Sequence, residues 1–186
     1  PKLTNVLNSK KKIYEIIFVD DDSRDGSKTI FEKIKKKNIK FFVRKQKPRD
    51  LSKSVVYGFK KSKFENLVVM DGDLQHRPVD LLKLMSLYEK KKYDLVIGSR
   101  KMISYKSTNL NPIRFYVSRL LNFITNLLFN YNLIDPMSGF FIINKKIFYK
   151  VEKNLFLLGY KILLDIITSS KKKIVFKEVY INFKSR

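Results

Sequence analysis

The chain of 186 residues carries 40 Lys and Arg residues against 17 Asp and Glu residues, which gives a formal net charge of +23. A hydrophobic fraction of 44% argues against disorder, and the length suits one domain with a real core. The absence of cysteine excludes disulfides, thiolate chemistry and Cys-ligated zinc, and no signal peptide or apolar stretch of about 20 residues, as a bilayer span requires, is found.

The first half of the chain alternates strand-like and helix-like patterns. Apolar runs rich in β-branched and aromatic residues predict buried strands over 13–19, 39–43, 67–70 and 93–97. Helical spacing predicts helices over 27–37, with Ser27 as N-cap, over 51–62, with Val55, Val56 and Phe59 inward, and from Pro78 to about Lys91.

The second half begins with a polar segment over 101–111, which reads as a loop. Residues 115–131 then place apolar side chains at helical spacing opposite a polar face. This amphipathic helix either packs on the core or lies in a membrane interface, where a basic surface would assist it. A strand over 139–144, a helix over 159–170 and a strand over 174–183 complete the expected elements.

The alternation of apolar strands with helices predicts an α/β fold, with a mostly parallel sheet that helices cover on both faces. In such sheets ligands bind at the carboxyl ends of the strands. Three predicted strands end there in charged groups: Asp20 to Asp22, Asp71 with Asp73, and Arg100. Two acidic strand ends beside a cationic one suit a nucleoside diphosphate held by Mg²⁺ or Mn²⁺, with Gln75 as a further oxygen ligand.

Each of these signals also has a plainer interpretation. Most Asp-x-Asp sequences are turns, and a lone histidine such as His76 is more often structural than a ligand. The segment 135–139 is locally only a turn, because its Pro and Gly separate two apolar elements.

Taken together, the motifs resemble those of family 2 glycosyltransferases of the polyprenyl (dolichyl) phosphate mannose synthase type. They occur in family order across nearly the whole chain: IIFVDDDSRDGS (16–27), LSKSVVYGF (51–59), VVMDGDLQHRP (68–78), VIGSR (96–100), VSRLLNF (117–123), DPMSGFF (135–141) and GYKILLDI (159–166). Each motif alone is weak, but the set is specific, and DPMSGFF is its most telling member.

The resemblance implies a GT-A (Rossmann-like) fold and metal-dependent, inverting transfer of mannose from GDP-mannose to a polyprenyl or dolichyl phosphate. It assigns residues by motif position. The metal would be bound by Asp71, Asp73 and Gln75, and the nucleotide by Asp20, Asp21, Asp71 and Gly72. The acceptor phosphate would be bound by Arg100, Arg114, Ser118 and Arg186. Catalysis would rest on Asp71, Asp73 and Arg100, while Asp135 and Lys161 are weaker candidates.

The chain also departs from the family pattern. Relatives begin with a strand ending in a Pro-Thr-Tyr-Asn-Glu-like segment, which this sequence lacks, and 1–7 resembles the helix that follows that segment. The chain also stops at Arg186, before a Gly-containing loop. We therefore expect a single GT-A domain over 1–186 that is truncated at both ends and lacks the first strand of its sheet. Asp50, where many relatives have glycine, is expected to be a tolerated loop change.

The positive charge fits an enzyme that meets a lipid acceptor at the cytoplasmic face of a membrane as a peripheral protein, with a membrane-spanning partner subunit as a further candidate partner. Codon bias explains the lysines equally well. Three alternatives stay open: the same fold with UDP-glucose or another donor, an inactive remnant or partner subunit, and a basic nucleic-acid-binding protein. No motif of a specific nucleic-acid binder is present.

Overall fold

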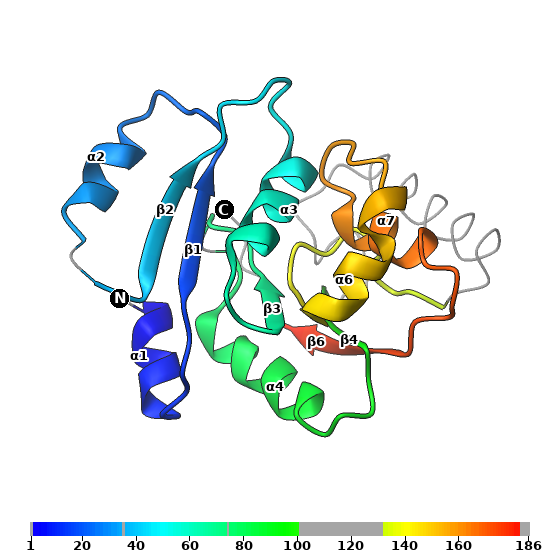
Figure 1. Ribbon diagram of the computed structural model, residues 1–186. Coiled ribbons are helices and arrows are strands. Elements are labelled where there is room, and N and C mark those ends of the chain that lie inside the picture. Colours follow the sequence, from blue (N-terminus) through cyan, green and yellow to red (C-terminus); the bar gives the residue numbers. More distant parts are fainter. Residues whose placement is uncertain (1, 35, 74, 101–131, 183–186) are drawn as a thin grey trace, which may run out of the picture.

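The computed structural model describes residues 2–34, 36–73, 75–100 and 132–182, and it folds as an α/β protein (Figure 1). The strands are β1 (Ile16–Asp20), β2 (Ile39–Val43), β3 (Asn66–Val69), β4 (Leu95–Arg100), β5 (Phe141–Asn144) and β6 (Phe176–Ile181). The helices are α1 (Lys2–Ser9), α2 (Ser27–Glu32), α3 (Leu51–Lys61), α4 (Pro78–Tyr88), α6 (Lys145–Val151), the 3₁₀ helix η2 (Glu152–Asn154) and α7 (Ile162–Thr168).

The larger sheet has the strand order β3-β5-β4-β6. β4 and β6 are parallel, whereas β5 runs antiparallel to both of its neighbours, β3 and β4. Phe141 at the start of β5 is opposite Val69 on one side and Ile97 on the other. The reversed direction of β5 therefore places the segment before it, 135–140, next to the carboxyl ends of β3 and β4.

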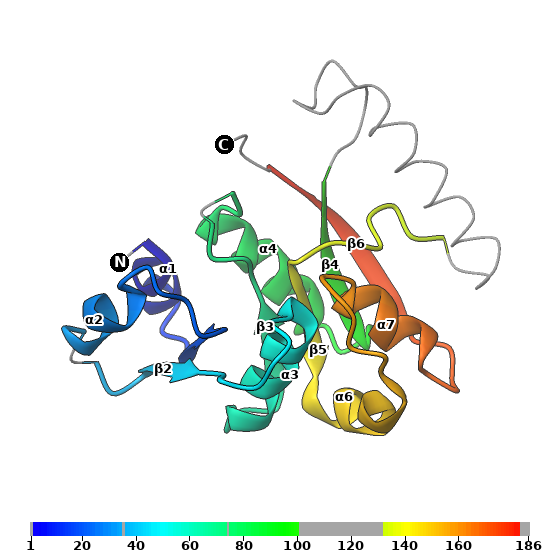
Figure 2. The ribbon, with the colours of Figure 1, turned by 90° about the horizontal axis from the view of Figure 1, so that it is seen from above.

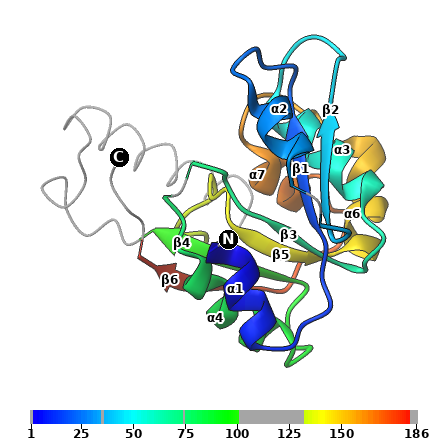
Figure 3. The same cartoon turned by 90° about the vertical axis from the view of Figure 1, so that its left-hand side faces the viewer.

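Helices cover both faces of this sheet, as the apolar strands predict. On one face, buried side chains of α3, α6 and α7 pack on alternate residues of β3, β4 and β5, including Leu67, Ile97 and Phe141. On the other face, α4 and α1 pack on Val96 and Ile142, and α1 lies along α4 (Figure 3). The two cores explain why β4 is apolar at every position from Leu95 to Ile97.

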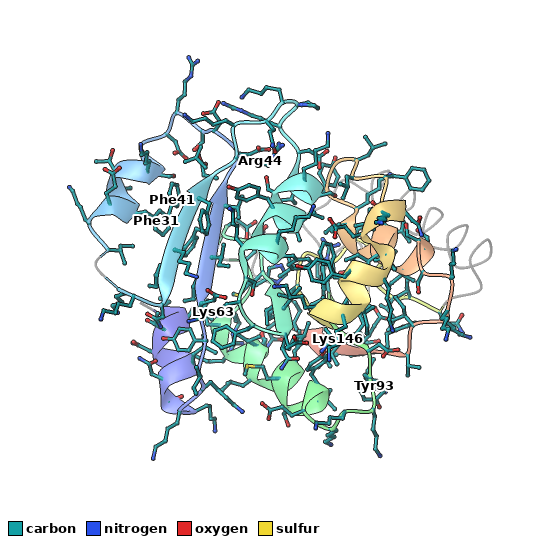
Figure 4. All side chains as sticks on the ribbon, in the orientation of Figure 1. Phe31, Phe41, Arg44, Lys63, Tyr93 and Lys146 are labelled. Carbon is teal, nitrogen blue, oxygen red and sulfur yellow. The ribbon has the colours of Figure 1, made fainter. Side chains whose placement is uncertain are left out.

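The parallel pair of β1 and β2 forms a second, two-stranded sheet. It lies apart from the larger sheet (Figure 2), and the described residues form no ladder between β1 and β3. α3 connects the two sheets, because Gly58 faces Ile17 and Val19 of β1 while Val56 joins the core of the larger sheet. On the far side of the pair, Phe31 of α2 stacks on Phe41 of β2 (Figure 4).

Most predicted elements are present, with shorter bounds. The prediction of Ser27 as N-cap is wrong: Gly26, in the left-handed region, is the N-cap, and the Ser27 N–H donates to Asp25 Oδ1. Helix α6 was not predicted; it begins after Asn144, whose side chain accepts a hydrogen bond from the Lys146 N–H. The loop over 101–111 and the helix over 115–131 lie outside the described residues. Within the described part of the chain, no helix is long and apolar enough to cross a membrane.

A buried carboxylate before β1 joins the two-stranded sheet to the end of α3. Glu15, whose side chain is 4% exposed, lies 2.7 Å from Lys40 Nζ of β2 and accepts hydrogen bonds from Lys63 N–H and Ser62 Oγ. Burial raises the pKa of Glu15, but the Lys40 hydrogen bond and charge and the Lys63 and Ser62 hydrogen bonds together outweigh it, so the pKa is lowered from its ordinary value of 4.5.

Replacing Glu15 by Gln should lower the free energy of unfolding by about 1–3 kcal/mol at neutral pH, because Lys40 loses its anionic partner. A lowered pKa means that the contribution is fully present above pH 4.5 and is lost as the pH falls through the lower folded-state pKa. Urea unfolding at a series of pH values measures both effects. Glu32→Gln, in an exposed pair with Lys28, is the control and should change stability by less than about 0.5 kcal/mol. Equal losses in the two variants would contradict the assignment.

Candidate active site

The acidic turn after β3 is built around Asp71. Its Oδ2 lies 3.3 Å from Nε2 of His76, a buried ring that packs against Phe140 at 5.0 Å between centroids. Asp73 Oδ1 accepts the Gln75 N–H at 3.1 Å, which closes the turn. His76 is therefore a buried residue of the fold, and its ring also positions the Asp71 carboxylate.

Gly139 forms the wall against which the Asp71 carboxylate lies. A Cβ atom built on Gly139 would sit 2.3 Å from Asp71 Oδ2 and 2.5 Å from Oδ1. No real Cβ tolerates such contacts, so only glycine at this position leaves room for the carboxylate where it is. This close approach is a reason for the Gly in the DPMSGFF motif that the local sequence did not reveal.

The same segment fixes Arg100 at the end of β4. Asp135, only 2% exposed, accepts from Arg100 Nε at 2.7 Å and from Nη2 at 2.8 Å, a bidentate pair. These hydrogen bonds raise the pKa of Arg100 above its ordinary value, against the opposing effect of burial, and the charges of Asp135 and Asp71 add to the shift. Arg100 is therefore a permanent cation close to Asp71.

Two further groups hold the 135–140 segment in place. Ser138 Oγ donates to the Gly98 carbonyl at 2.6 Å, and the Gly98 N–H donates to the Phe140 carbonyl at 2.8 Å. Glu178 of β6 accepts from Ser99 Oγ at 2.5 Å and from the N–H groups of Ile134 and Asp135 at 2.7 and 3.1 Å. The loop that carries Asp135 and Gly139 is thereby anchored on both β4 and β6.

The acidic end of β1 makes a separate set of contacts. Asp20 accepts from the Ser23 N–H and hydroxyl at 2.9 and 2.5 Å. Asp21 Oδ1 lies 2.6 Å from Nη2 of the buried Arg44, at the end of β2 (Figure 4), and its Oδ2 accepts the Asp50 N–H at 2.5 Å. Asp50 itself caps α3 through Lys53 N–H and accepts the Gly159 N–H at 2.6 Å. The acid at position 50 thus ties three loops together and is more than a tolerated change.

The structure brings some of the predicted site residues together and leaves others apart. The segment 135–140 gathers Asp71 and Arg100, with Asp73, Gln75 and Gly72 on the same turn, while Asp20 and Asp21 stand at the end of the separate two-stranded sheet. Lys161 is exposed at the start of α7. Arg114, Ser118 and Arg186 lie outside the described residues.

Sequence reasoning ranked Asp135 low and missed Gly139 and Glu178. No local signal marks them, because each acts on a residue at least 35 positions away in the chain.

The side chains of Asp71, Asp73 and Gln75 after β3 suit a hard divalent cation, which prefers oxygen ligands such as carboxylates and amide carbonyls. Within the described ranges no group of three or more His, Cys, Asp or Glu residues is placed to hold a metal.

Comparison with known proteins adds the family to this geometry. Residues 2–152 match the profile described as Glycosyl transferase family 2. A dolichol-phosphate mannosyltransferase of Pyrococcus furiosus is 34% identical over 160 residues, which are 85% of this chain and 45% of the relative. A protein of the same name from Mycosarcoma maydis is 33% identical over 159 residues, 84% of this chain and 53% of the relative. The chain thus spans about half the length of these curated relatives.

Solved structures agree on the fold. Glucosyl-3-phosphoglycerate synthase from Mycobacterium tuberculosis, in complex with Mn²⁺, UDP-glucose and phosphoglyceric acid, superposes with a TM-score of 0.69 at 14% identity, over 100% of this chain and 68% of that one. The same enzyme with Mg²⁺ and UDP gives a TM-score of 0.62 at 13% identity. These likenesses confirm the expected GT-A fold class, and the mannosyltransferase relatives confirm the resemblance seen in the motifs.

Proposed function

Because the chain belongs to glycosyl transferase family 2, we propose that it carries the catalytic site of a glycosyltransferase that moves mannose from GDP-mannose to a polyprenyl or dolichyl phosphate. The observation that carries this proposal is the contact of one segment, 135–140, with both an acidic turn and an arginine. Gly139 leaves room for Asp71, and Asp135 orients Arg100. The Asp71 carboxylate, which would bind a cation, and the Arg100 guanidinium, which would bind a phosphate, then lie at the same end of the sheet.

The residues after β3 fit a divalent cation. Asp71, Asp73 and Gln75 would hold Mg²⁺ or Mn²⁺, and His76 and Gly139 would fix the first of these ligands. When bound, the cation supplies Lewis-acid stabilisation of the negative charge that develops on the nucleoside diphosphate leaving group. Asp20, Asp21 and Gly72 are proposed contacts of the nucleotide.

The acceptor needs no protein base in this scheme. A phosphate monoester has its second pKa at about 6, so the acceptor is largely dianionic at neutral pH and is already a nucleophile. Arg100, held by Asp135, would orient that phosphate for attack on the anomeric carbon. Arg114, Ser118 and Arg186 are proposed to bind the same phosphate. A single displacement of this kind inverts the anomeric configuration, so a product with retained configuration would contradict it.

The test is transfer of labelled sugar into a lipid-extractable product, with polyprenyl phosphate as acceptor and either GDP-mannose or UDP-glucose as donor. We expect label from GDP-mannose only, with loss of transfer on chelation and its recovery with Mn²⁺ or Mg²⁺. Binding of GDP and of UDP in the presence of Mn²⁺ gives a readout that does not depend on turnover. Label from UDP-glucose alone would change the donor. Failure of both donors and both nucleotides would overturn the proposal.

A further inference from the structure

The loop between η2 and α7 displays a row of apolar side chains to solvent. Phe156, Leu158 and Tyr160 are 79%, 70% and 73% exposed. Leu155 and Leu157, which alternate with the first two, pack against the core. We call the three outward side chains the apolar ridge. The free energy cost of exposing large apolar side chains makes such a cluster a marker of an interaction site.

Hydrogen bonds to Asp165, Asp50 and Ser52 hold the backbone of the loop that carries the ridge. Asp165 accepts the Phe156 and Leu157 N–H groups at 3.1 and 2.8 Å. The Gly159 carbonyl accepts from both the N–H and the hydroxyl of Ser52, at 2.9 and 2.8 Å, while Asp50 accepts its N–H. Leu157 has a φ of 55°, a conformation that residues with a Cβ rarely adopt. These contacts fix the loop in the conformation that exposes Phe156, Leu158 and Tyr160.

The surroundings of the ridge are cationic. Exposed basic residues near it in sequence, or on the neighbouring loop before α3, are Arg49, Lys153 and Lys161. Acids of the same region are already paired: Asp22 with Lys47 at 2.9 Å, and Glu152 with Lys60. Another exposed apolar residue, Leu51, precedes the Ser52 that contacts Gly159. Apolar side chains among exposed cations, on a chain of net charge +23, complement an anionic lipid surface.

The ridge is also connected to the acidic end of β1, which carries the proposed nucleotide contacts Asp20 and Asp21. Asp50 links the two directly, since its N–H donates to Asp21 and its carboxylate accepts from Gly159. In Figure 1 the loops before α2, before α3 and before α7 all lie at the upper end of the molecule. We propose that the apolar ridge inserts into the interfacial region of an anionic bilayer and orients this end of the molecule toward the membrane.

Tryptophan fluorescence tests the insertion, because the chain contains no tryptophan and a single introduced one is the only reporter. Phe156→Trp should show a blue-shifted emission and quenching by brominated lipids on vesicles of phosphatidylcholine mixed with phosphatidylserine. The matched control is Ile13→Trp, at an 88% exposed apolar position before the amino end of β1, and its emission should stay that of a water-exposed indole. Equal responses at the two positions, or none at position 156, would overturn the proposal.

Vesicle flotation measures the contribution of the ridge to affinity. Replacing Phe156, Leu158 and Tyr160 together by Ser should weaken binding at least about ten-fold, because the apolar area transferred into the lipid is lost. The control Ile13→Ser/Val175→Ser removes exposed apolar side chains before β1 and β6 and should bind as the unchanged chain does. Circular dichroism verifies that each variant is folded. The vesicles contain neither sugar donor nor polyprenyl phosphate, so the outcome is separate from that of the transfer assay. Undiminished binding of the triple variant would contradict the inference.

Discussion

Replacing Gly139 by Ala should reduce sugar transfer roughly a hundred-fold and weaken Mn²⁺ binding about ten-fold or more, while leaving the fold intact. The added Cβ would lie 2.3 Å from Asp71 Oδ2. The atom that must yield is the end of a side chain, so the cost falls on the position of the carboxylate and little of it on stability. Initial rates, Mn²⁺ titration by electron paramagnetic resonance and thermal unfolding measure the three quantities.

Gly58→Ala is the matched control. Its added Cβ would meet Val19 Cγ2 of β1 at 3.2 Å, a packing contact between α3 and the two-stranded sheet. This variant should change the unfolding temperature and leave Mn²⁺ affinity unchanged. A Gly139→Ala protein that transfers sugar within a few-fold of the unchanged chain would show that the Asp71 position seen here is not required for activity.

The sequence motifs pointed to the charged residues at the strand ends, but the contacts that position these residues depend on the tertiary structure. The strand ends at Asp71 and Arg100 could be found because apolar runs stop abruptly at charged residues, and parallel strands bring such ends to one edge. The strand at 139–144 was placed correctly in the chain, but nothing in FIIN indicates its direction. The antiparallel course of β5 is what brings 135–140 to that edge.

The supporting residues could not be predicted for the same reason. The spacing of His76 and Asp71 in the chain does not resemble a zinc site on a helix, and only the structure shows that the His76 ring lies beside the Asp71 carboxylate. Glu178 likewise reaches Ser99 and Asp135 only because β6 pairs with β4. Asp50 looked like an exception to the family pattern, and only the position of Gly159 shows that its carboxylate has a partner. Local patterns find the charged groups, and strand order decides which of them meet.

Asp71→Asn and Asp73→Asn should each lower the rate of transfer a hundred-fold or more, which corresponds to about 2.7 kcal/mol or more of lost transition-state stabilisation. Both substitutions keep the shape of the side chain and remove its charge, so the turn that Asp73 closes with the Gln75 N–H is retained. Initial rates at saturating and limiting Mn²⁺ separate weaker metal binding from slower chemistry. Rates within ten-fold of the unchanged chain for both variants would rule out these carboxylates as the metal pair.

The double variant Asp71→Asn/Gly139→Ala distinguishes a residue that acts through Asp71 from one that acts independently. If Gly139 matters only because it leaves room for the Asp71 carboxylate, its substitution should cost little once that carboxylate is gone, and the double variant should be about as slow as Asp71→Asn alone. Asp73→Asn/Gly139→Ala is the comparison, because the three atoms nearest to a Cβ built on Gly139 all belong to Asp71. There the two losses should come closer to multiplying. Multiplied losses in the Asp71 pair would instead assign Gly139 a role of its own, such as direct contact of its backbone with the substrate.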